Sequence, residues 1–202
     1  MFYHRRSIRL KGYDYSQAGS YFITICTYYR ECLFGTISNN EMQLNNCGKI
    51  VETSWLNIPN YFSNVVLDKF IVMPNHLHGI LSIKPTVGAQ FISPSDLINA
   101  SPDMGINKSA IDNKHEGAID NKDEGAMNCA PTVGHIIRAF KARTTSTVNR
   151  QKGSYGMPIW QRNYYENIVR DEAALDKIRQ YIECNPGKWA FDKDNPNSSI
   201  YS

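Results

Sequence analysis

Two stretches in the first half of the chain are dense in apolar residues and have the pattern of strands. Residues 20–29 alternate β-branched and aromatic side chains with polar ones. Residues 65–73 and 77–83 are two apolar runs separated by Pro74 and Asn75. Runs of this length and composition predict β-strands, with a short break at the proline. Two shorter pieces, 33–37 and 42–44, predict a hairpin.

Apolar residues recur at helical spacing in three other places. They predict helices at about 46–58, 132–149 and 171–184, the last beginning at the N-cap Asp171 and stopped at Pro186. The resulting order of strands, a hairpin and interspersed helices is typical of the α+β class with a mainly antiparallel sheet.

Residues 85–130 interrupt this pattern. They are rich in Asn, Asp, Ser, Gly and Ala, and the segment 110–117 is repeated almost unchanged at 118–125. Polar units of eight residues cannot build a solenoid, so we interpret them as a duplicated loop. The sequence thus predicts a single domain over 1–202 with a flexible, acidic, repeat-containing insertion at about 86–130.

Composition and charge narrow the possible partners. With 202 residues, 42% of them hydrophobic and 20% charged, the chain is an ordinary globular protein. The net charge is only +3, but residues 131–152 contain five basic residues and no acidic one. This segment supplies the candidate phosphate contacts Arg138, Lys141 and Arg143. A solvated helix face would have the same composition, so charge alone leaves both interpretations open.

Cysteine usage and hydropathy bear on location. The five cysteines are scattered and form no CxxC motif, which argues against a zinc–cysteine site and favours a cytoplasmic setting. No apolar run reaches the length of a membrane span, so we expect no membrane association.

The strand that follows Pro74 carries two histidines, His76 and His78. Residues two apart on a strand point to the same face, so the two imidazoles can present ring nitrogens to one divalent ion. The bare His-x-His pattern is equally compatible with two histidines that only line the polar face of a half-buried strand.

The last predicted helix carries a second candidate pair, Tyr181 and Asn185, which share a helix face at i and i+4. A tyrosine hydroxyl is a competent nucleophile toward a metal-activated electrophile, and an amide oxygen is an acceptable ligand for Mg²⁺ or Mn²⁺. The alternative is a surface tyrosine and a helix-capping asparagine. Pro186 disfavours helical geometry at Asn185, which would loosen this spacing.

Aromatic and basic residues also alternate in the strand-like stretch 159–170. Arg162 and Tyr164 are the candidates there for binding unpaired bases by stacking and charge. Core aromatics flanked by snorkelling arginines would show the same pattern.

Together these motifs resemble the single-tyrosine HUH transposases, and among them the REP-associated tyrosine transposases. The resemblance covers about residues 5–190 apart from the insertion, and it is carried by four motifs: Gly19-Ser-Tyr-Phe-Ile-Thr-Ile-Cys26, Val72-Met-Pro-Asn-His-Leu-His-Gly-Ile80, Trp160-Gln-Arg-Asn-Tyr-Tyr-Glu-Asn-Ile-Val-Arg-Asp171 and Tyr181-Ile-Glu-Cys-Asn-Pro186. It implies a ferredoxin-like antiparallel sheet with helices packed on it. It also implies Mg²⁺ or Mn²⁺ on His76 and His78, Asn185 as a third ligand and Tyr181 as the nucleophile.

The activity implied by this resemblance is cleavage and rejoining of single-stranded or hairpin DNA through a 5′-phosphotyrosine intermediate, by a monomer or a homodimer. The long insertion and the short tail after Pro186 depart from the family. Two other hypotheses come from different classes. One is a ferredoxin-like nucleic-acid-binding protein without cleavage activity, and the other is a small metal-dependent hydrolase of a soluble phosphate ester.

Overall fold

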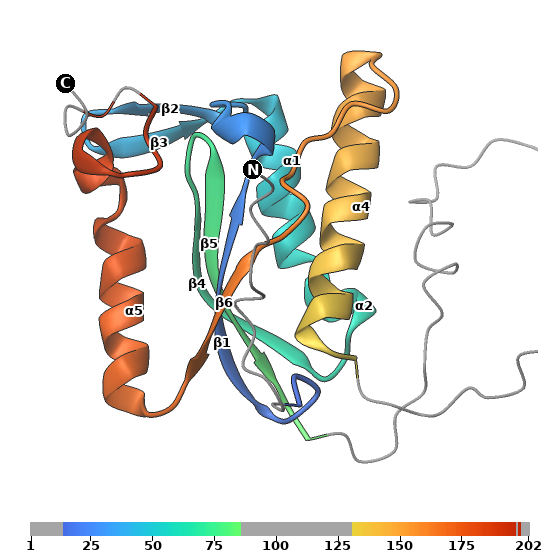
Figure 1. Ribbon diagram of the computed structural model, residues 1–202, viewed down its shortest axis with the longest axis vertical. Helices are drawn as coiled ribbons and strands as arrows, with labels where there is room; N and C mark the ends of the chain where they lie inside the picture. Colours follow the sequence, from blue (N-terminus) through green and yellow to red (C-terminus); the bar gives the residue numbers. More distant parts are fainter. Residues whose placement is uncertain (1–13, 86–130, 197, 199–202) are drawn as a thin grey trace, which may run out of the picture.

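The computed structural model describes residues 14–85, 131–196 and 198. The predicted insertion at about 86–130 lies outside the described residues, as do the N-terminal residues 1–13 (Figure 1). Within the described part of the chain, no helix has both the length and the apolar character needed to cross a membrane.

Four antiparallel strands form the main sheet, in the spatial order β4-β5-β1-β6. They are β1 (Gly19–Cys26), β4 (Val65–Val72), β5 (His76–Ile83) and β6 (Tyr165–Val169). Helix α1 (Asn46–Leu56) connects β1 to β4, and α4 (Val133–Lys152) follows β5 and precedes β6. This is a βαββαβ arrangement, so the predicted α+β, ferredoxin-like fold class is confirmed.

The sheet has a different cover on each face. Helices α1 and α4 lie on one face, and α5 (Glu172–Cys184) lies on the other (Figure 1). The large core is on the α1/α4 side, where Trp55 and Phe140 pack on Leu77 and Leu81 of β5. The smaller cluster under α5 contains Ile80, Leu175 and Ile182. Alternation along β5 therefore sends its even-numbered side chains, His76 and His78 included, toward α5.

Small elements complete the fold. A two-stranded ribbon, β2 (Gly35–Ser38) with β3 (Glu41–Leu44), turns through Asn39 and Asn40, both in left-handed backbone conformations with φ of 52° and 62°. Such a two-residue turn matches the twist of the paired strands. The short helices are η1 (Tyr28–Arg30), α2 (Ile58–Tyr61) and η2 (Pro186–Phe191).

The predicted strand at 159–170 is shorter than expected. Only Tyr165–Val169 pairs as β6, while Trp160 forms a single bridge with Thr27. The Lys141 ammonium donates hydrogen bonds to the carbonyls of Gln161 and Asn163, at 2.9 and 3.0 Å. Those carbonyls are thus occupied by a side chain, and ladder pairing begins only after them. Similarly, the strand expected to extend to residue 29 ends at Cys26, before η1.

Position 79 of β5, next to His78, has no room for a side chain larger than that of glycine. A Cβ atom at this position would come within 2.4 Å of Cζ2 of Trp55, whose ring is fully buried. We expect Gly79→Ala to lower the free energy of unfolding by about 1–3 kcal/mol, because the indole has no room to retreat. Urea denaturation followed by circular dichroism measures the change.

The matched control for this prediction is Gly187→Ala. Its nearest neighbour would be Cβ of Asn40 at 3.9 Å, an ordinary van der Waals contact. A Gly79→Ala protein as stable as the unsubstituted protein would show that Trp55 is not packed against β5 in this way.

Candidate active site

Strand pairing brings the two histidines to one point on the α5 face of the sheet. His76 lies opposite Cys26 of β1, and His78 lies opposite Thr24. The two imidazole rings are 4.5 Å apart between centroids, and their exposed fractions are 0% and 4%. Both rings therefore converge in a site that bulk water barely reaches.

Burial also determines the charge state of these rings. Because desolvation penalises the imidazolium form, it lowers the pKa of His76 and that of His78, each to about 3. Both side chains are neutral at physiological pH. A neutral imidazole has a free nitrogen lone pair, which is the form that binds metal ions.

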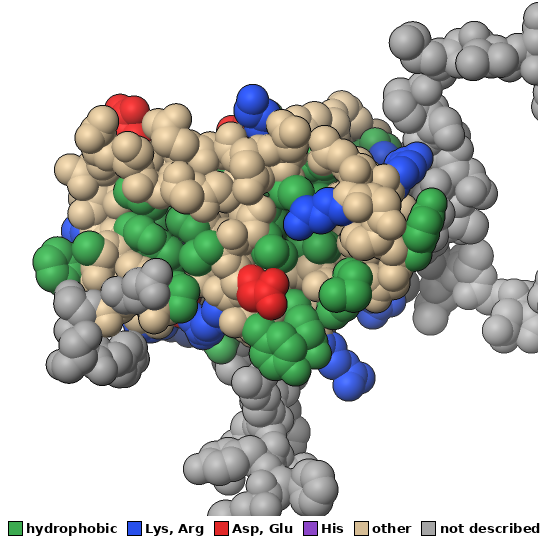
Figure 2. All heavy atoms as spheres, turned by 90° about the horizontal axis from the view of Figure 1, so that it is seen from above, with side chains coloured by type: hydrophobic (Ala, Val, Ile, Leu, Met, Phe, Trp, Pro, Cys, Tyr) green, Lys and Arg blue, Asp and Glu red, His purple; other side chains and the backbone are tan. Residues whose placement is uncertain are grey.

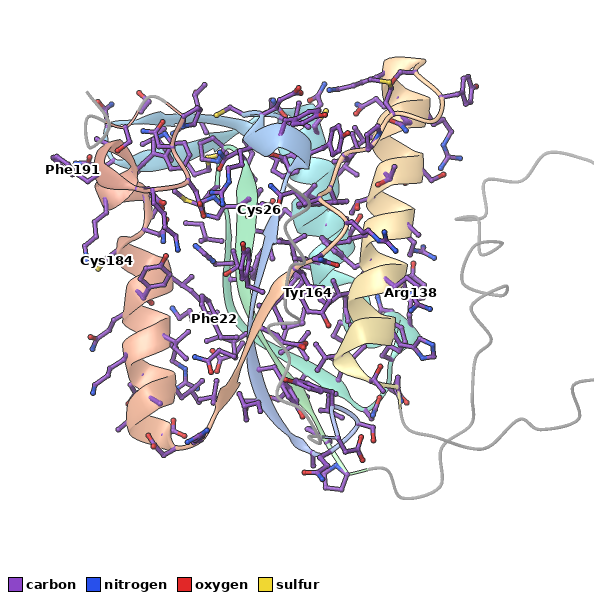
Figure 3. All side chains as sticks on the ribbon, viewed as in Figure 1. Phe22, Cys26, Arg138, Tyr164, Cys184 and Phe191 are labelled. Carbon is purple, nitrogen blue, oxygen red and sulfur yellow. The ribbon has the colours of Figure 1, made fainter. Side chains whose placement is uncertain are left out.

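Helix α5 places Tyr181 directly over His78. The Tyr181 hydroxyl lies 3.2 Å from Nε2 of His78, and the two ring centroids are 5.2 Å apart. Phe22 of β1 stacks on His78 and meets the edge of Tyr181, and Figure 3 shows it pointing from the sheet toward α5. The ring of Tyr181 is half-buried, and this burial raises the pKa of its hydroxyl, against the lowering effect of the neighbouring Asn185 side chain.

Asn185 retains the helical spacing that Pro186 was expected to loosen. Its φ and ψ of −61° and −44° are helical, and the chain continues directly into η2 with the proline in its first turn. A proline is tolerated at a helix start, where its missing N–H is not needed. Asn185 therefore stays one turn beyond Tyr181 on the same face of α5, with an exposed fraction of 3%.

The donor atoms at this site fit a hard divalent metal ion. Nε2 of His76 and Oδ1 of Asn185 are both buried and have no hydrogen-bond partner. Buried polar atoms are rarely left unpaired, so two such atoms beside Nε2 of His78 are an arrangement that a bound cation would satisfy. In the described residues, no cluster of three or more His, Cys, Asp and Glu side chains provides another metal site.

Charged groups also tie the helix that carries Tyr181 to β4. Arg179 forms a forked interaction with Asp68 of β4, with its Nε and Nη2 atoms at 3.0 and 2.6 Å from Oδ2. Asp68 lies in the irregular part of β4 between Leu67 and Phe70, where the register shifts. A second ion pair joins Lys69 to Glu183. These pairs add to the apolar cluster beneath α5, where Leu175 and Ile182 pack on Ile80.

The residues predicted to bind DNA lie elsewhere. Arg138, Lys141 and Arg143 are on α4, and Figure 3 shows Arg138 and Tyr164 on the α4 side of the sheet, away from α5. Arg143 stacks on the ring of Tyr61 at 3.9 Å and hydrogen-bonds to its hydroxyl. Burial lowers the pKa of Lys141 to about 8. Arg162 is exposed on the loop before β6.

Several site neighbours were not predicted from the sequence. The Thr24 hydroxyl lies 2.8 Å from Nδ1 of His78, and the ring of Trp189 is 6.0 Å from that of His76. The negative charge of Asp192 partly opposes the lowering of the His78 pKa by burial, and it adds to the raised pKa of Tyr181. The alternation along β1 indicated that Phe22 and Thr24 share a face, but not which strand lies beside them. Nothing in the sequence pattern indicated Asp192.

Comparison with known proteins adds relatives in sequence and in structure. No protein-family model matches the chain. An uncharacterized protein of Haemophilus influenzae is 42% identical over 192 residues, which is 95% of this chain and 93% of that protein. A REP-associated tyrosine transposase, solved bound to a REP hairpin, superposes with a TM-score of 0.50 at 15% identity, over 96% of this chain and 77% of the transposase.

A candidate transposase from Deinococcus radiodurans superposes with a TM-score of 0.40 at 18% identity, over 87% of this chain and 95% of that chain. At 15% identity the likeness to the REP-associated tyrosine transposase concerns the fold, and it confirms the fold that the sequence resemblance implied. The chain belongs to one family with the Haemophilus influenzae protein, and it has the fold of a REP-associated tyrosine transposase.

Proposed function

We propose that this protein is a metal-dependent single-stranded DNA endonuclease and strand transferase of the single-tyrosine HUH transposase type. The observation that carries the proposal is the position of the Tyr181 hydroxyl, 3.2 Å from Nε2 of His78. Beside it lie two buried atoms without partners, Nε2 of His76 and Oδ1 of Asn185. A nucleophile and a set of metal-ligand atoms thus meet at one point.

In this proposal His76, His78 and Asn185 hold Mg²⁺ or Mn²⁺. The metal ion, when bound, supplies a Lewis acid that withdraws charge from the oxygens of a DNA phosphate. The two imidazoles would bind as neutral ligands, and the amide would supply the oxygen that hard cations prefer. Phe22 and Trp189, packed against the histidines, exclude water from their apolar sides.

Tyr181 then serves as the nucleophile. Its oxygen forms a bond to phosphorus while the bond between phosphorus and the 3′-oxygen breaks, leaving a 5′-phosphotyrosine and a free 3′-hydroxyl. The new ester conserves the energy of the phosphodiester, so reversal of the attack rejoins strands without a nucleotide cofactor. Burial raises the pKa of the Tyr181 hydroxyl, which disfavours its phenolate form in the DNA-free protein.

The surface near the site supports the proposed substrate class. Figure 2 shows the end of the molecule near η1 and η2, where hydrophobic side chains are interspersed with Lys and Arg and acidic side chains are sparse among the described residues. Such a surface suits a polyanion with unpaired bases. The REP hairpin carried by the structurally similar transposase supports hairpin DNA as the substrate.

The basic side of α4 is the proposed second contact for DNA. The exposed side chains of Arg138 and Arg162 are placed to contact phosphates away from the reaction centre. Lys141 donates hydrogen bonds to backbone carbonyls, so its main role in this proposal is to hold the segment that carries Tyr164. Arg143 is engaged by Tyr61 of α2. We further propose that residues 1–202 act as one functional domain.

Replacing Tyr181 by Phe removes one oxygen and tests the nucleophile. We expect Tyr181→Phe to bind single-stranded hairpin DNA as well as the unsubstituted protein and to form no covalent adduct in the presence of Mn²⁺. Denaturing gel electrophoresis with end-labelled DNA measures the adduct. Tyr165→Phe, which changes a half-exposed tyrosine of β6 in the same way, serves as the control and should keep the adduct.

An adduct that persists in Tyr181→Phe, or that mass spectrometry locates on Tyr164 or Tyr165, would refute the assignment of the nucleophile. Stable binding of DNA with no adduct in any protein would favour the nucleic-acid-binding alternative.

Replacing His76 by Ala tests the metal site. We expect His76→Ala to lose at least about tenfold in Mn²⁺ affinity, measured by isothermal titration calorimetry, because one of the proposed metal ligands is removed. DNA cleavage should fall with it, while DNA affinity should change little, since basic residues elsewhere carry it. His135→Ala changes an exposed histidine of α4 and is the matched control. Equal Mn²⁺ affinity in the two variants would exclude the proposed ligand set.

A further inference from the structure

Asn75, the residue before His76, is fully buried, and all the polar atoms of its side chain are used. Its Nδ2 donates hydrogen bonds to two backbone carbonyls, that of Arg30 at 3.0 Å and that of Asp194 at 2.5 Å. A carbonyl oxygen can only accept, so the NH₂ end of the amide must face these two groups. The amide oxygen, Oδ1, therefore faces the third partner, Nδ1 of His76, at 2.8 Å.

This network determines the tautomer of His76. An amide oxygen can only accept a hydrogen bond, so the proton of the neutral imidazole must be on Nδ1. Its lone pair is then on Nε2, the buried ring atom that has no partner. His78 differs, because both of its partners are hydroxyls, those of Thr24 and Tyr181. A hydroxyl donates or accepts, so these contacts allow either tautomer of His78.

We propose that Asn75 is a positioning residue, which fixes the tautomer and the orientation of His76 before any metal ion binds and which joins this ring to the turn at Tyr28–Arg30. The first part follows from the network above, since a ring with a fixed lone pair needs no rearrangement to become a ligand. The inference rests on the proposed function in that His76 is taken as a metal ligand.

The second part of the proposal, the link between His76 and the turn at Tyr28–Arg30, follows from the shape of the turn. Tyr29 and Arg30 are consecutive non-glycine residues with φ of 52° and 58°, in the left-handed region. Such residues remain in this region only where their surroundings hold them. Asn75 supplies one of the holding bonds through the Arg30 carbonyl, and the ion pair between Arg30 and Asp194 supplies another.

The turn holds Tyr29 out into solvent, with an exposed fraction of 77%. One amide thus connects a metal-ligand ring to a strained turn that presents an aromatic side chain on the surface. The same amide also reaches the C-terminal segment through the Asp194 carbonyl. Three parts of the chain that are distant in sequence therefore meet at Asn75.

The tautomer can be measured without metal or DNA. Long-range ¹H–¹⁵N correlation spectra of the metal-free protein should show His76 protonated on Nδ1 and unprotonated on Nε2. We expect Asn75→Ala to give a mixture of tautomers and to lose at least about tenfold in Mn²⁺ affinity. Asn75→Asp keeps an acceptor for Nδ1 but loses both donors, so it should restore the His76 tautomer and leave the turn at Tyr28–Arg30 altered in backbone amide shifts.

Asn149→Ala is the matched control. Asn149 is also a buried asparagine, and it donates to the carbonyl of Met157 at 2.9 Å, on α4 at the other side of the sheet. It should leave the His76 tautomer unchanged and the Mn²⁺ affinity within about twofold. Any general loss of stability from removing a buried amide appears in both variants, whereas the tautomer change appears only at Asn75.

A His76 ring protonated on Nε2 in the unsubstituted protein would overturn the proposal, and this measurement stands even if Asn75→Ala fails to fold. An Asn75→Ala protein with the original tautomer and the original Mn²⁺ affinity would overturn it as well. These readouts are independent of DNA cleavage. A protein that shows them but forms no phosphotyrosine would contradict the proposed function and leave the positioning role of Asn75 intact.

Discussion

The antiparallel register between β1 and β5 is the constraint on which the candidate site depends. It sets Thr24 opposite His78 and Cys26 opposite His76, so the two imidazoles rise from the middle of a four-stranded sheet. A slip of one residue would send both rings into the core under α1 and α4, because side chains alternate between faces. The apolar face of β5 prevents this slip, since Leu77 and Leu81 are fully buried among the side chains of the large core.

Burial gives the site its chemical character. The rings of His76 and His78 are 4.5 Å apart, and burial disfavours the charged form of each, which lowers both pKa values. The cost of such burial is that every polar atom needs a partner. Asn75 and Thr24 hydrogen-bond to the Nδ1 atoms of His76 and His78. Nε2 of His76 and Oδ1 of Asn185 have no partner, and they are the atoms that we propose bind a metal ion.

The two faces of the sheet are stabilised differently. The face under α1 and α4 is covered by a continuous apolar core. Helix α5 rests on a small apolar cluster and on ion pairs such as Arg179 with Asp68. Partly exposed pairs of this kind are weaker and more sensitive to salt than a core. The histidines therefore lie on a strand that packs on the large core, while the tyrosine lies on a helix with a smaller apolar contact.

Local patterns in the sequence determined much of this protein. Alternation and helical periodicity were enough to predict the main strands and helices and the α+β class. The His-x-His spacing and the spacing from Tyr181 to Asn185 were enough to identify two candidate pairs of site residues. These follow from the period of a strand or a helix, which involves only neighbours in the chain. Only the tertiary structure decided that the two pairs meet, because this depends on strand order and on how α5 packs. It also decided that Lys141 is bonded to the carbonyls before β6 and that Asn75 joins His76 to Arg30. The position of α4 on the face of the sheet opposite to α5 was likewise a matter of tertiary structure. Each of these is a contact between residues far apart in sequence, and no local pattern carries that information.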